Sequence, residues 1–118
     1  MYKPPFLFRG PTRFPHFQAS IAKLEEESKD QDGLNFTIAI NYGSRDEICR
    51  AVKKIVAEGI APEDITEQVI SDHLDTAGIP DPDLMIRTSG ELRLSNFLLW
   101  QMAYTEFYFT DVAWPDFN

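Results

Sequence analysis

The sequence is poor in residues that would point to several common classes of protein. Cys49 is the only cysteine, so neither an intramolecular disulfide nor a cysteine-based zinc cluster is expected, and a reducing compartment fits best. No stretch approaches the roughly eighteen consecutive apolar residues that a membrane-spanning helix needs. Residues 1–15 have too short an apolar run and too many prolines for a secretory leader. The sequence therefore predicts neither an integral membrane protein nor a disulfide-stapled secreted one.

Basic residues are also scarce, which limits the partners that the protein can have. Eleven Lys and Arg against nineteen Asp and Glu give a net charge of −8. A general nucleic-acid surface needs a basic footprint, so nucleic acid is not an expected partner. A phosphate ligand stays compatible with this charge, because a few arginines and a helix N-terminus can bind one inside an acidic protein. His16 and His73 lie far apart without partner spacing, and no Ser/His/Asp triad or phosphate-binding Gly-rich loop is visible.

What the sequence does contain is an alternation of strand and helix patterns. The apolar spacing predicts strands at 6–8, 34–41, 84–87 and 106–110, and helices from about 15, from 44 to 58, from about 62 or 66 to 76, and over 95–104. Ser44 with Glu47 has the spacing of a capping box, and Ser95 is an N-cap candidate. The second helix is predicted to bury Ile48, Val52, Ile55 and Val56. Strands joined by helix-length connections predict an α/β fold with a parallel sheet and flanking helices.

Cations and hydroxyls gather where one predicted strand gives way to a predicted helix. Arg87 closes the strand LMIR, Gly90 permits a close backbone approach, and Arg93 and Ser95 stand just before the helix. Two guanidiniums, a hydroxyl and a helix N-terminus within nine residues are typical of a phosphate or diphosphate site. Glu106 begins the next strand, where a carboxylate can face the same crevice and hold a divalent cation.

Each of these residues also has an ordinary structural interpretation. A strand-end arginine often pairs with a nearby carboxylate, and Ser95 can be no more than a helix cap. Without further context, Glu106 is more simply an edge glutamate. The spacing alone thus leaves the diphosphate site and a purely structural loop as alternatives.

Two stretches of the sequence resemble a known family. Residues 81–117, DPDLMIRTSGELRLSNFLLWQMAYTEFYFTDVAWPDF, resemble the C-terminal signature of the cis-prenyltransferases, which include undecaprenyl and dehydrodolichyl diphosphate synthases. Residues 34–48, LNFTIAINYGSRDEI, resemble an upstream stretch of the same family, and residues 6–15 match it loosely. The strong resemblance covers about residues 33–117. It implies that residues 1–118 form a single, incomplete domain, the C-terminal half of a Rossmann-like parallel sheet with flanking helices.

The resemblance also implies an activity and a set of site residues. Family members condense isopentenyl diphosphate onto an allylic diphosphate such as farnesyl diphosphate, with Mg²⁺, to give cis-polyprenyl diphosphates. By position, Arg87, Arg93 and Ser95 are implied to grip isopentenyl diphosphate. Gly90 and Glu91 belong to the same loop motif, and Glu106 is implied to be the magnesium-linked carboxylate.

The departure from the family pattern is as informative as the match. Family members carry an Asp-Gly-Asn-Gly-Arg-Trp stretch whose aspartate is central to catalysis, and residues 1–118 contain no such stretch. No catalytic residue is therefore assigned, and the isolated chain is expected to be inactive. The first hypothesis is a cis-prenyltransferase, and the alternatives are a non-catalytic partner subunit or inactive fragment, and an unrelated phosphate-binding α/β domain.

The expected partners follow from the same resemblance. They are the isopentenyl and allylic diphosphate substrates, and a second copy or a related chain in a homodimer or heteromer. The protein is expected in the cytoplasm or peripherally at a membrane, with a plastid as the alternative if the source is a plant.

Overall fold

The computed structural model describes the backbone of residues 6–8 and 15–118, and the side chains from residue 16 onward. The chain forms two compact units, Met1–Tyr42 and Gly43–Asn118. No helix within the described residues is long and apolar enough to cross a bilayer. The prediction of a single domain stays a prediction.

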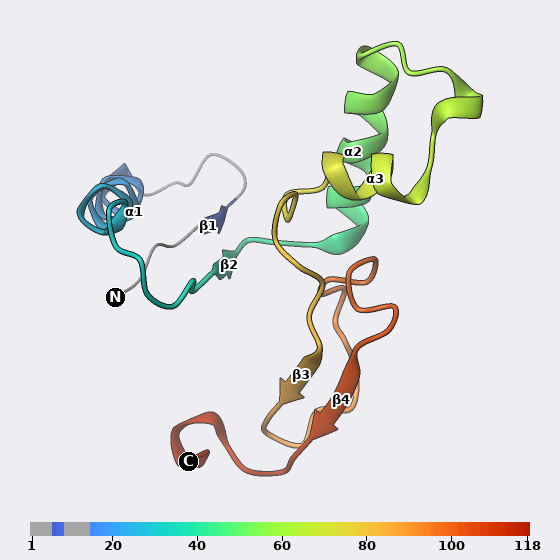
Figure 1. Cartoon of the computed structure of the whole chain (residues 1–118). Coiled ribbons are helices and arrows are strands. Elements are labelled where there is room, and N and C mark those ends of the chain that lie inside the picture. The colour runs from blue at the N-terminus through green and yellow to red at the C-terminus, as the bar shows by residue number, and fades with distance from the viewer. Residues whose placement is uncertain (1–5, 9–14) are drawn as a thin grey trace. The chain divides into compact units, whose positions relative to one another are not determined.

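The first unit contains two short strands and one helix. Strand β1 (Phe6–Phe8) pairs in parallel with β2 (Ile38–Ile40), and helix α1 (Pro15–Ser28) lies between them in the chain (Figure 1). The predicted strand over 34–41 is too long, since only Ile38–Ile40 form β2. Leu34 and Phe36, which the alternating pattern placed on a buried face, are exposed.

The second unit contains the remaining helices and strands. Helix α2 (Ser44–Ala57) is followed by the 3₁₀ turn η1 (Pro62–Asp64) and by helix α3 (Glu67–His73), which contacts α2. Strand β3 (Leu84–Arg87) then pairs in parallel with β4 (Glu106–Phe109), and a 3₁₀ turn η2 (Trp114–Asp116) lies near the C-terminus (Figure 1). The prediction of an α/β fold with parallel strands and helices is confirmed.

The buried face of α2 differs from the predicted apolar stripe. Ile55 is buried as expected, but Val52 and Val56 are exposed, Val56 to 71%. The buried positions of the helix are Ser44, Glu47, Arg50, Ala51 and Ile55. Periodicity located the helix correctly, but only part of the predicted stripe is buried: Ile55 is buried and Ile48 half-buried. Polar residues share the buried face because they have hydrogen-bond partners elsewhere in the unit.

The capping box predicted at the start of α2 is also wrong. Gly43 is the N-cap residue, and no side chain of the segment itself caps the helix. Ser44 Oγ instead accepts a hydrogen bond from the backbone N–H of Leu99 at 3.0 Å. Glu47 is fully buried, and its carboxylate accepts from the N–H of Asp75 at 2.9 Å and from Nε2 of Gln101 at 3.0 Å.

The predicted helix over 95–104 is absent, and with it the N-cap role of Ser95. The segment is a series of turns. Ser95, Asn96 and Leu98 have φ values of 50°, 64° and 45°, in the left-handed region that a right-handed helix excludes. The backbone N–H of Leu99 donates to Ser44 Oγ and not to a carbonyl one helical turn earlier. Tertiary hydrogen bonds therefore override the local helix pattern.

Helix α3 begins at the second of the two predicted positions. Thr66 is its N-cap, and Thr66 Oγ1 accepts from the N–H of Val69 at 3.2 Å. The helix ends at His73 rather than at the predicted Thr76. The shorter helix follows from the extended backbone of Leu74, whose ψ is 162°.

Candidate functional site

The loop after β3 is fastened to the end of β4 by backbone hydrogen bonds. The N–H of Thr110 donates to the carbonyl of Arg87 at 3.0 Å, and the N–H of Gly90 donates to the carbonyl of Thr110 at 3.0 Å. Gly90 has a φ of 71°, and a Cβ there would lie 3.3 Å from Oδ1 of Asp111. Both the left-handed backbone and the close approach favour glycine at this position, so the sequence sets a tight turn directly after Arg87.

Both arginines of the predicted site belong to this loop. Nη1 of Arg87 donates to the backbone carbonyl of Arg93, and Nη1 of Arg93 pairs with Oε2 of Glu91. The side chains of Arg93 and Glu91 are 68% and 41% exposed. We call residues Arg87–Ser95 the arginine loop. The structural alternative raised from the sequence was that the strand-end Arg87 pairs with a carboxylate. Among the described residues, Arg87 instead donates to a backbone carbonyl, and it is Arg93 that pairs with a carboxylate.

The Arg93–Glu91 pair leaves Arg93 able to change partners. Exposed ion pairs contribute only about 0–1 kcal/mol, because water and salt screen them. A diphosphate carries more than one negative charge and is a stronger partner for a guanidinium than a single exposed carboxylate. Ser95 is exposed two residues further on. Since no helix begins at Ser95, the predicted contribution of a helix dipole to anion binding is wrong.

An apolar cavity of about 140 Å³ lies next to the arginine loop. Its lining residues are Met85, Ile86, Arg87, Leu94, Phe97 and Met102. An apolar hollow that includes an arginine suits a ligand with an anionic head and a short hydrocarbon group.

Glu106 and Arg87 lie at opposite ends of the strand pair. Glu106 pairs in register with Leu84 at the amino ends of the two strands, whereas Arg87 pairs with Phe109 at the carboxyl ends. Three strand positions separate the two levels by about 10 Å. The described residues contain no group of three His, Cys, Asp or Glu that could hold a metal ion. A magnesium ion at Glu106 would therefore need substrate phosphates and other oxygens to complete its ligand set.

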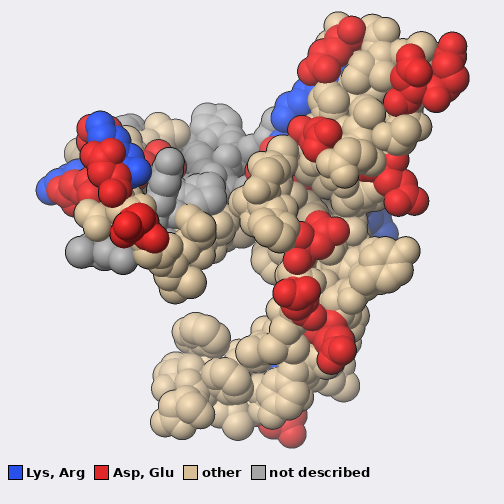
Figure 2. Space-filling view, viewed as in Figure 1, with Lys and Arg blue, Asp and Glu red and all other residues tan. Residues whose placement is uncertain are grey.

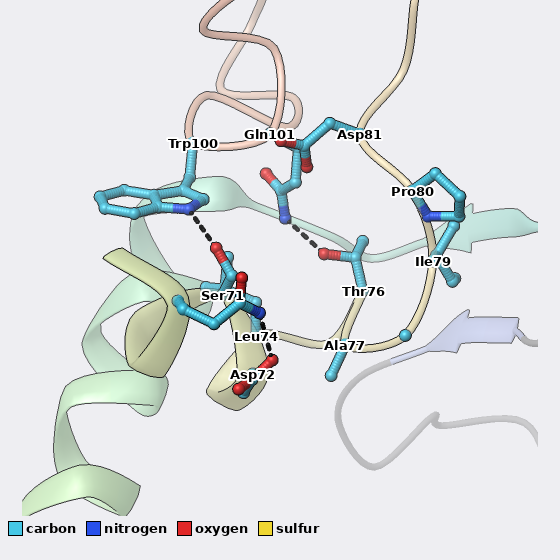
Figure 3. Close-up of a pocket in the computed structure, with 12 residues that line it drawn as sticks. Ser71, Asp72, Leu74, Thr76, Ala77, Ile79, Pro80, Asp81, Trp100 and Gln101 are labelled. Atoms are coloured by element: carbon cyan, nitrogen blue, oxygen red, sulfur yellow. Dashed lines mark hydrogen bonds between the residues drawn. The ribbon is translucent and has the colours of Figure 1, made fainter. Parts of the chain in front are cut away.

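A larger cavity of about 360 Å³ is lined by α3, by the segment 74–81 that leads from α3 towards β3, and by Trp100 and Gln101 (Figure 3). Nε1 of Trp100 donates to Ser71 Oγ at 3.0 Å, and Nε2 of Gln101 donates to Thr76 Oγ1 at 2.9 Å. Asp72 and Asp81 contribute carboxylates to the lining, which includes no basic side chain. This cavity therefore does not suit a diphosphate, although it is the larger of the two.

The distribution of charged side chains also favours the arginine loop as the site of an anionic ligand. Figure 2 shows acidic side chains gathered over α2, η1 and α3. The buried guanidinium of Arg50 donates to both carboxylate oxygens of Asp75, at 2.7 and 2.6 Å, and to Asp46 at 2.7 Å. The hydrogen bond to Asp75 raises the pKa of Arg50 further above its ordinary value. Arg50 is thus a structural cation, and the exposed Arg93 is available for a ligand.

Sequence reasoning did not single out Asn96, which joins the arginine loop to α2. Its backbone carbonyl accepts from the N–H of Ser44 at 2.8 Å, and its Oδ1 accepts from the N–H of Arg45 at 2.9 Å. An asparagine beside a serine, at the start of a supposed helix, was a signal for a left-handed turn, because asparagine tolerates that conformation better than most residues. The strength of the helix pattern after it concealed this signal.

The fold and the loop define an α/β protein with parallel strand pairs and an arginine-bearing loop at the carboxyl end of β3. The profile of the undecaprenyl diphosphate synthase family matches residues 12–118, so the chain belongs to this family of prenyltransferases.

Relatives and solved structures agree with this assignment. The chain is 58% identical over 107 residues to an isoprenyl transferase of Geobacillus kaustophilus, covering 87% of this chain and 42% of the relative. It is 55% identical to an isoprenyl transferase of Staphylococcus saprophyticus, covering 84% and 41%. The chain thus spans less than half the length of these relatives.

Two solved structures share the fold over nearly the whole chain. Lavandulyl diphosphate synthase from Lavandula x intermedia, in complex with dimethylallyl diphosphate, has a TM-score of 0.88 and 41% identity, covering 99% of this chain and 52% of that one. A probable undecaprenyl diphosphate synthase from Campylobacter jejuni has a TM-score of 0.84 and 32% identity, covering 99% and 54%.

Proposed function

We propose that this chain carries the isopentenyl diphosphate site of a cis-prenyltransferase. The complete reaction condenses isopentenyl diphosphate onto an allylic diphosphate, such as farnesyl diphosphate, to give a cis-polyprenyl diphosphate. The observation that carries the proposal is the arginine loop beside an apolar cavity, in a chain that belongs to a prenyltransferase family. The solved relative that binds dimethylallyl diphosphate, a five-carbon diphosphate, supports the ligand class.

The proposed roles follow from the chemistry of the loop. The guanidiniums of Arg87 and Arg93 neutralise the diphosphate, and the Ser95 hydroxyl donates a hydrogen bond to it. Gly90 keeps the backbone turn tight, and Glu91 holds Arg93 in place until the ligand replaces it. The 140 Å³ apolar cavity takes the five-carbon group. Hydrogen bonds to charged groups contribute about 1.5–3 kcal/mol each, so the arginines dominate the affinity.

The family resemblance also implies Mg²⁺, with Glu106 as the candidate ligand. Magnesium commonly binds one or two carboxylates together with substrate phosphates. Glu106 alone is not a complete site, so other groups would have to supply the remaining oxygens. In the complete reaction, charge develops on the departing diphosphate, and fixed cations stabilise it.

A second candidate is a non-catalytic partner subunit. The family resemblance leaves this candidate open, but the arginine loop matches the family pattern without substitution, and a chain released from catalysis would be expected to lose that pattern. A partner of this kind binds isopentenyl diphosphate and associates with a related chain that supplies the allylic site. The expected location for either candidate is the cytoplasm or the surface of a membrane.

Calorimetric titration of the 118-residue protein with isopentenyl diphosphate tests the proposal. Arg87→Ala and Arg93→Ala should each weaken binding by about ten- to a hundredfold, because each removes charge-assisted hydrogen bonds. Lys53→Ala removes an exposed positive charge from α2 and is the matched control, with affinity unchanged.

Two outcomes would contradict the proposal. Equal binding by the wild type and both arginine variants would remove the site assignment. Chain elongation from farnesyl and isopentenyl diphosphates by the 118-residue protein alone would show that it carries both substrate sites rather than one.

A further inference from the structure

The N-terminus of α2 is capped from a distant part of the chain. The first N–H groups of a helix have no partner within it and need acceptors from elsewhere. Here the N–H of Ser44 donates to the Asn96 carbonyl at 2.8 Å, and the N–H of Arg45 donates to Asn96 Oδ1 at 2.9 Å. A single residue, 51 positions further along the chain than Arg45, thus satisfies two donors of this helix.

Helix α2 also accepts a hydrogen bond from the turn at residues 96–99. Ser44, which is fully buried, accepts from the N–H of Leu99 at 3.0 Å. Gly43 makes the approach feasible, because a Cβ at this position would lie only 2.9 Å from Nδ2 of Asn96. Bonds in both directions and close contact join the start of α2 to residues 96–99.

These bonds hold a backbone conformation that is unfavourable by itself. Ser95 and Asn96 have φ values of 50° and 64°, and left-handed backbone costs free energy for residues other than glycine. Such conformations persist only where surrounding contacts over-determine them, often at binding sites. Ser95 is bonded covalently to Asn96, and Arg93 lies two residues before Ser95. The anchor at Asn96 therefore constrains the end of the arginine loop.

We propose that Asn96 is a positioning residue for the diphosphate site. By capping α2, it fixes the end of the arginine loop and orders Ser95 and Arg93 before the ligand arrives. A loop ordered in advance loses less conformational entropy on binding, so the affinity for a diphosphate is higher. This inference rests on the proposed function, and it adds a residue that needs no contact with the ligand.

Two single variants, Asn96→Ala and Gly43→Ala, and the corresponding double variant test the contact between Asn96 and the start of α2. Asn96→Ala removes the side-chain acceptor for Arg45. Gly43→Ala disturbs the same contact from the start of α2. The φ of Gly43 is −149°, which any residue adopts, so alanine causes no backbone strain there. The added Cβ would instead press on the Asn96 side-chain amide. If both act through the same contact, the double variant should be no worse than Asn96→Ala, as a double-mutant cycle would show.

Thr66→Ala is the matched control. It removes the N-cap acceptor of α3, to which the N–H of Val69 donates. The substitution should therefore lower the melting temperature by a similar amount, but at a position outside the arginine loop. Calorimetric titration with inorganic pyrophosphate is performed on each variant well below its melting temperature. Amide chemical shifts of Arg93 and Ser95 are recorded without ligand as a spectroscopic readout.

Asn96→Ala is expected to weaken pyrophosphate binding about tenfold and to move the amide signals of Arg93 and Ser95. Gly43→Ala should have a smaller effect of the same kind, and Thr66→Ala should bind as the wild type does. Wild-type affinity in Asn96→Ala, or an equal loss in Thr66→Ala, would overturn the inference and leave the proposed function standing. A wild-type chain that binds neither pyrophosphate nor isopentenyl diphosphate would overturn both.

Discussion

At the scale of single residues, exposure separates the two kinds of arginine in this protein. Arg50 is 8% exposed and bonded to both oxygens of Asp75, whereas the Arg93 side chain is 68% exposed beside Glu91. The sequence shows the same residue type in both places. Only the packing around each side chain decides which cation is committed to the fold and which is available to a ligand.

His73 gives the protein a pH-dependent contact between α3 and the end of α2. Its Nε2 lies 2.9 Å from Oε2 of Glu58, and its Nδ1 lies 2.6 Å from the Val69 carbonyl. The hydrogen bond with Glu58 raises the pKa of His73 above its ordinary value near 6.5. Because the folded state binds the proton more tightly, the contact stabilises the protein fully below about pH 6.5, and the stabilisation is lost as pH rises through the folded-state pKa.

The expected result is a melting-temperature difference between the wild type and His73→Gln that depends on pH. The wild type should be the more stable at pH 5.5, and the difference should shrink by pH 8.5. Differential scanning calorimetry at both values measures it. Glu58→Gln removes the largest cause of the raised pKa, so a His73→Gln substitution made in that background should show a smaller pH dependence. A difference that stays constant between the two pH values contradicts the assignment.

At the scale of elements, residues 95–104 show how a strong local pattern can fail. Their apolar spacing fits an amphipathic helix, yet the segment is a series of turns. The hydrogen bonds that decide its conformation reach Ser44 and Arg45, about fifty residues earlier. Hydrophobic periodicity contains no information about such partners, so no reading of the segment alone could have found them.

The ion pair between Arg50 and Asp75 joins α2 to the chain that leaves α3. Replacing Arg50 with Met would leave the Asp75 carboxylate, whose side chain is 21% exposed, without its bidentate partner. Removing one member of a buried pair is destabilising because the other charge stays desolvated. We expect the free energy of unfolding in urea to fall by about 3 kcal/mol. Arg45→Met, at an exposed position of the same helix, should change it by less than about 0.5 kcal/mol.

At the scale of the whole molecule, association is the open question, and within the second unit one face of the β3–β4 pair is largely apolar and exposed. Leu84, Ile86 and Tyr108 are 55%, 44% and 53% exposed, and they share this face with Glu106 because of the strand register. Contiguous apolar surface of this kind promotes association. If the chain forms a homodimer or heteromer, we therefore expect this face to lie in the interface.

Sedimentation velocity over a range of concentrations tests this surface. The wild type should self-associate, and Leu84→Lys should weaken the association by about tenfold, since it places a charge in the apolar face. The new lysine is opposite Glu106 in register, so the strand pair itself should tolerate the change. Val56→Lys, at an exposed position of α2, is the control. A wild type that stays monomeric at every concentration would exclude this face as an interface.

The sequence by itself determined the family, the α/β class, the parallel pairing of strands and the proximity of Arg87, Gly90 and Arg93 on one loop. These features depend on short motifs and on spacing within single segments, which neighbouring residues dictate. The tertiary structure decided the buried polar face of α2, the turns at 95–104 and the separation of Glu106 from Arg87. Those features depend on hydrogen bonds and strand register between segments far apart in the chain, and they arise only when the segments meet.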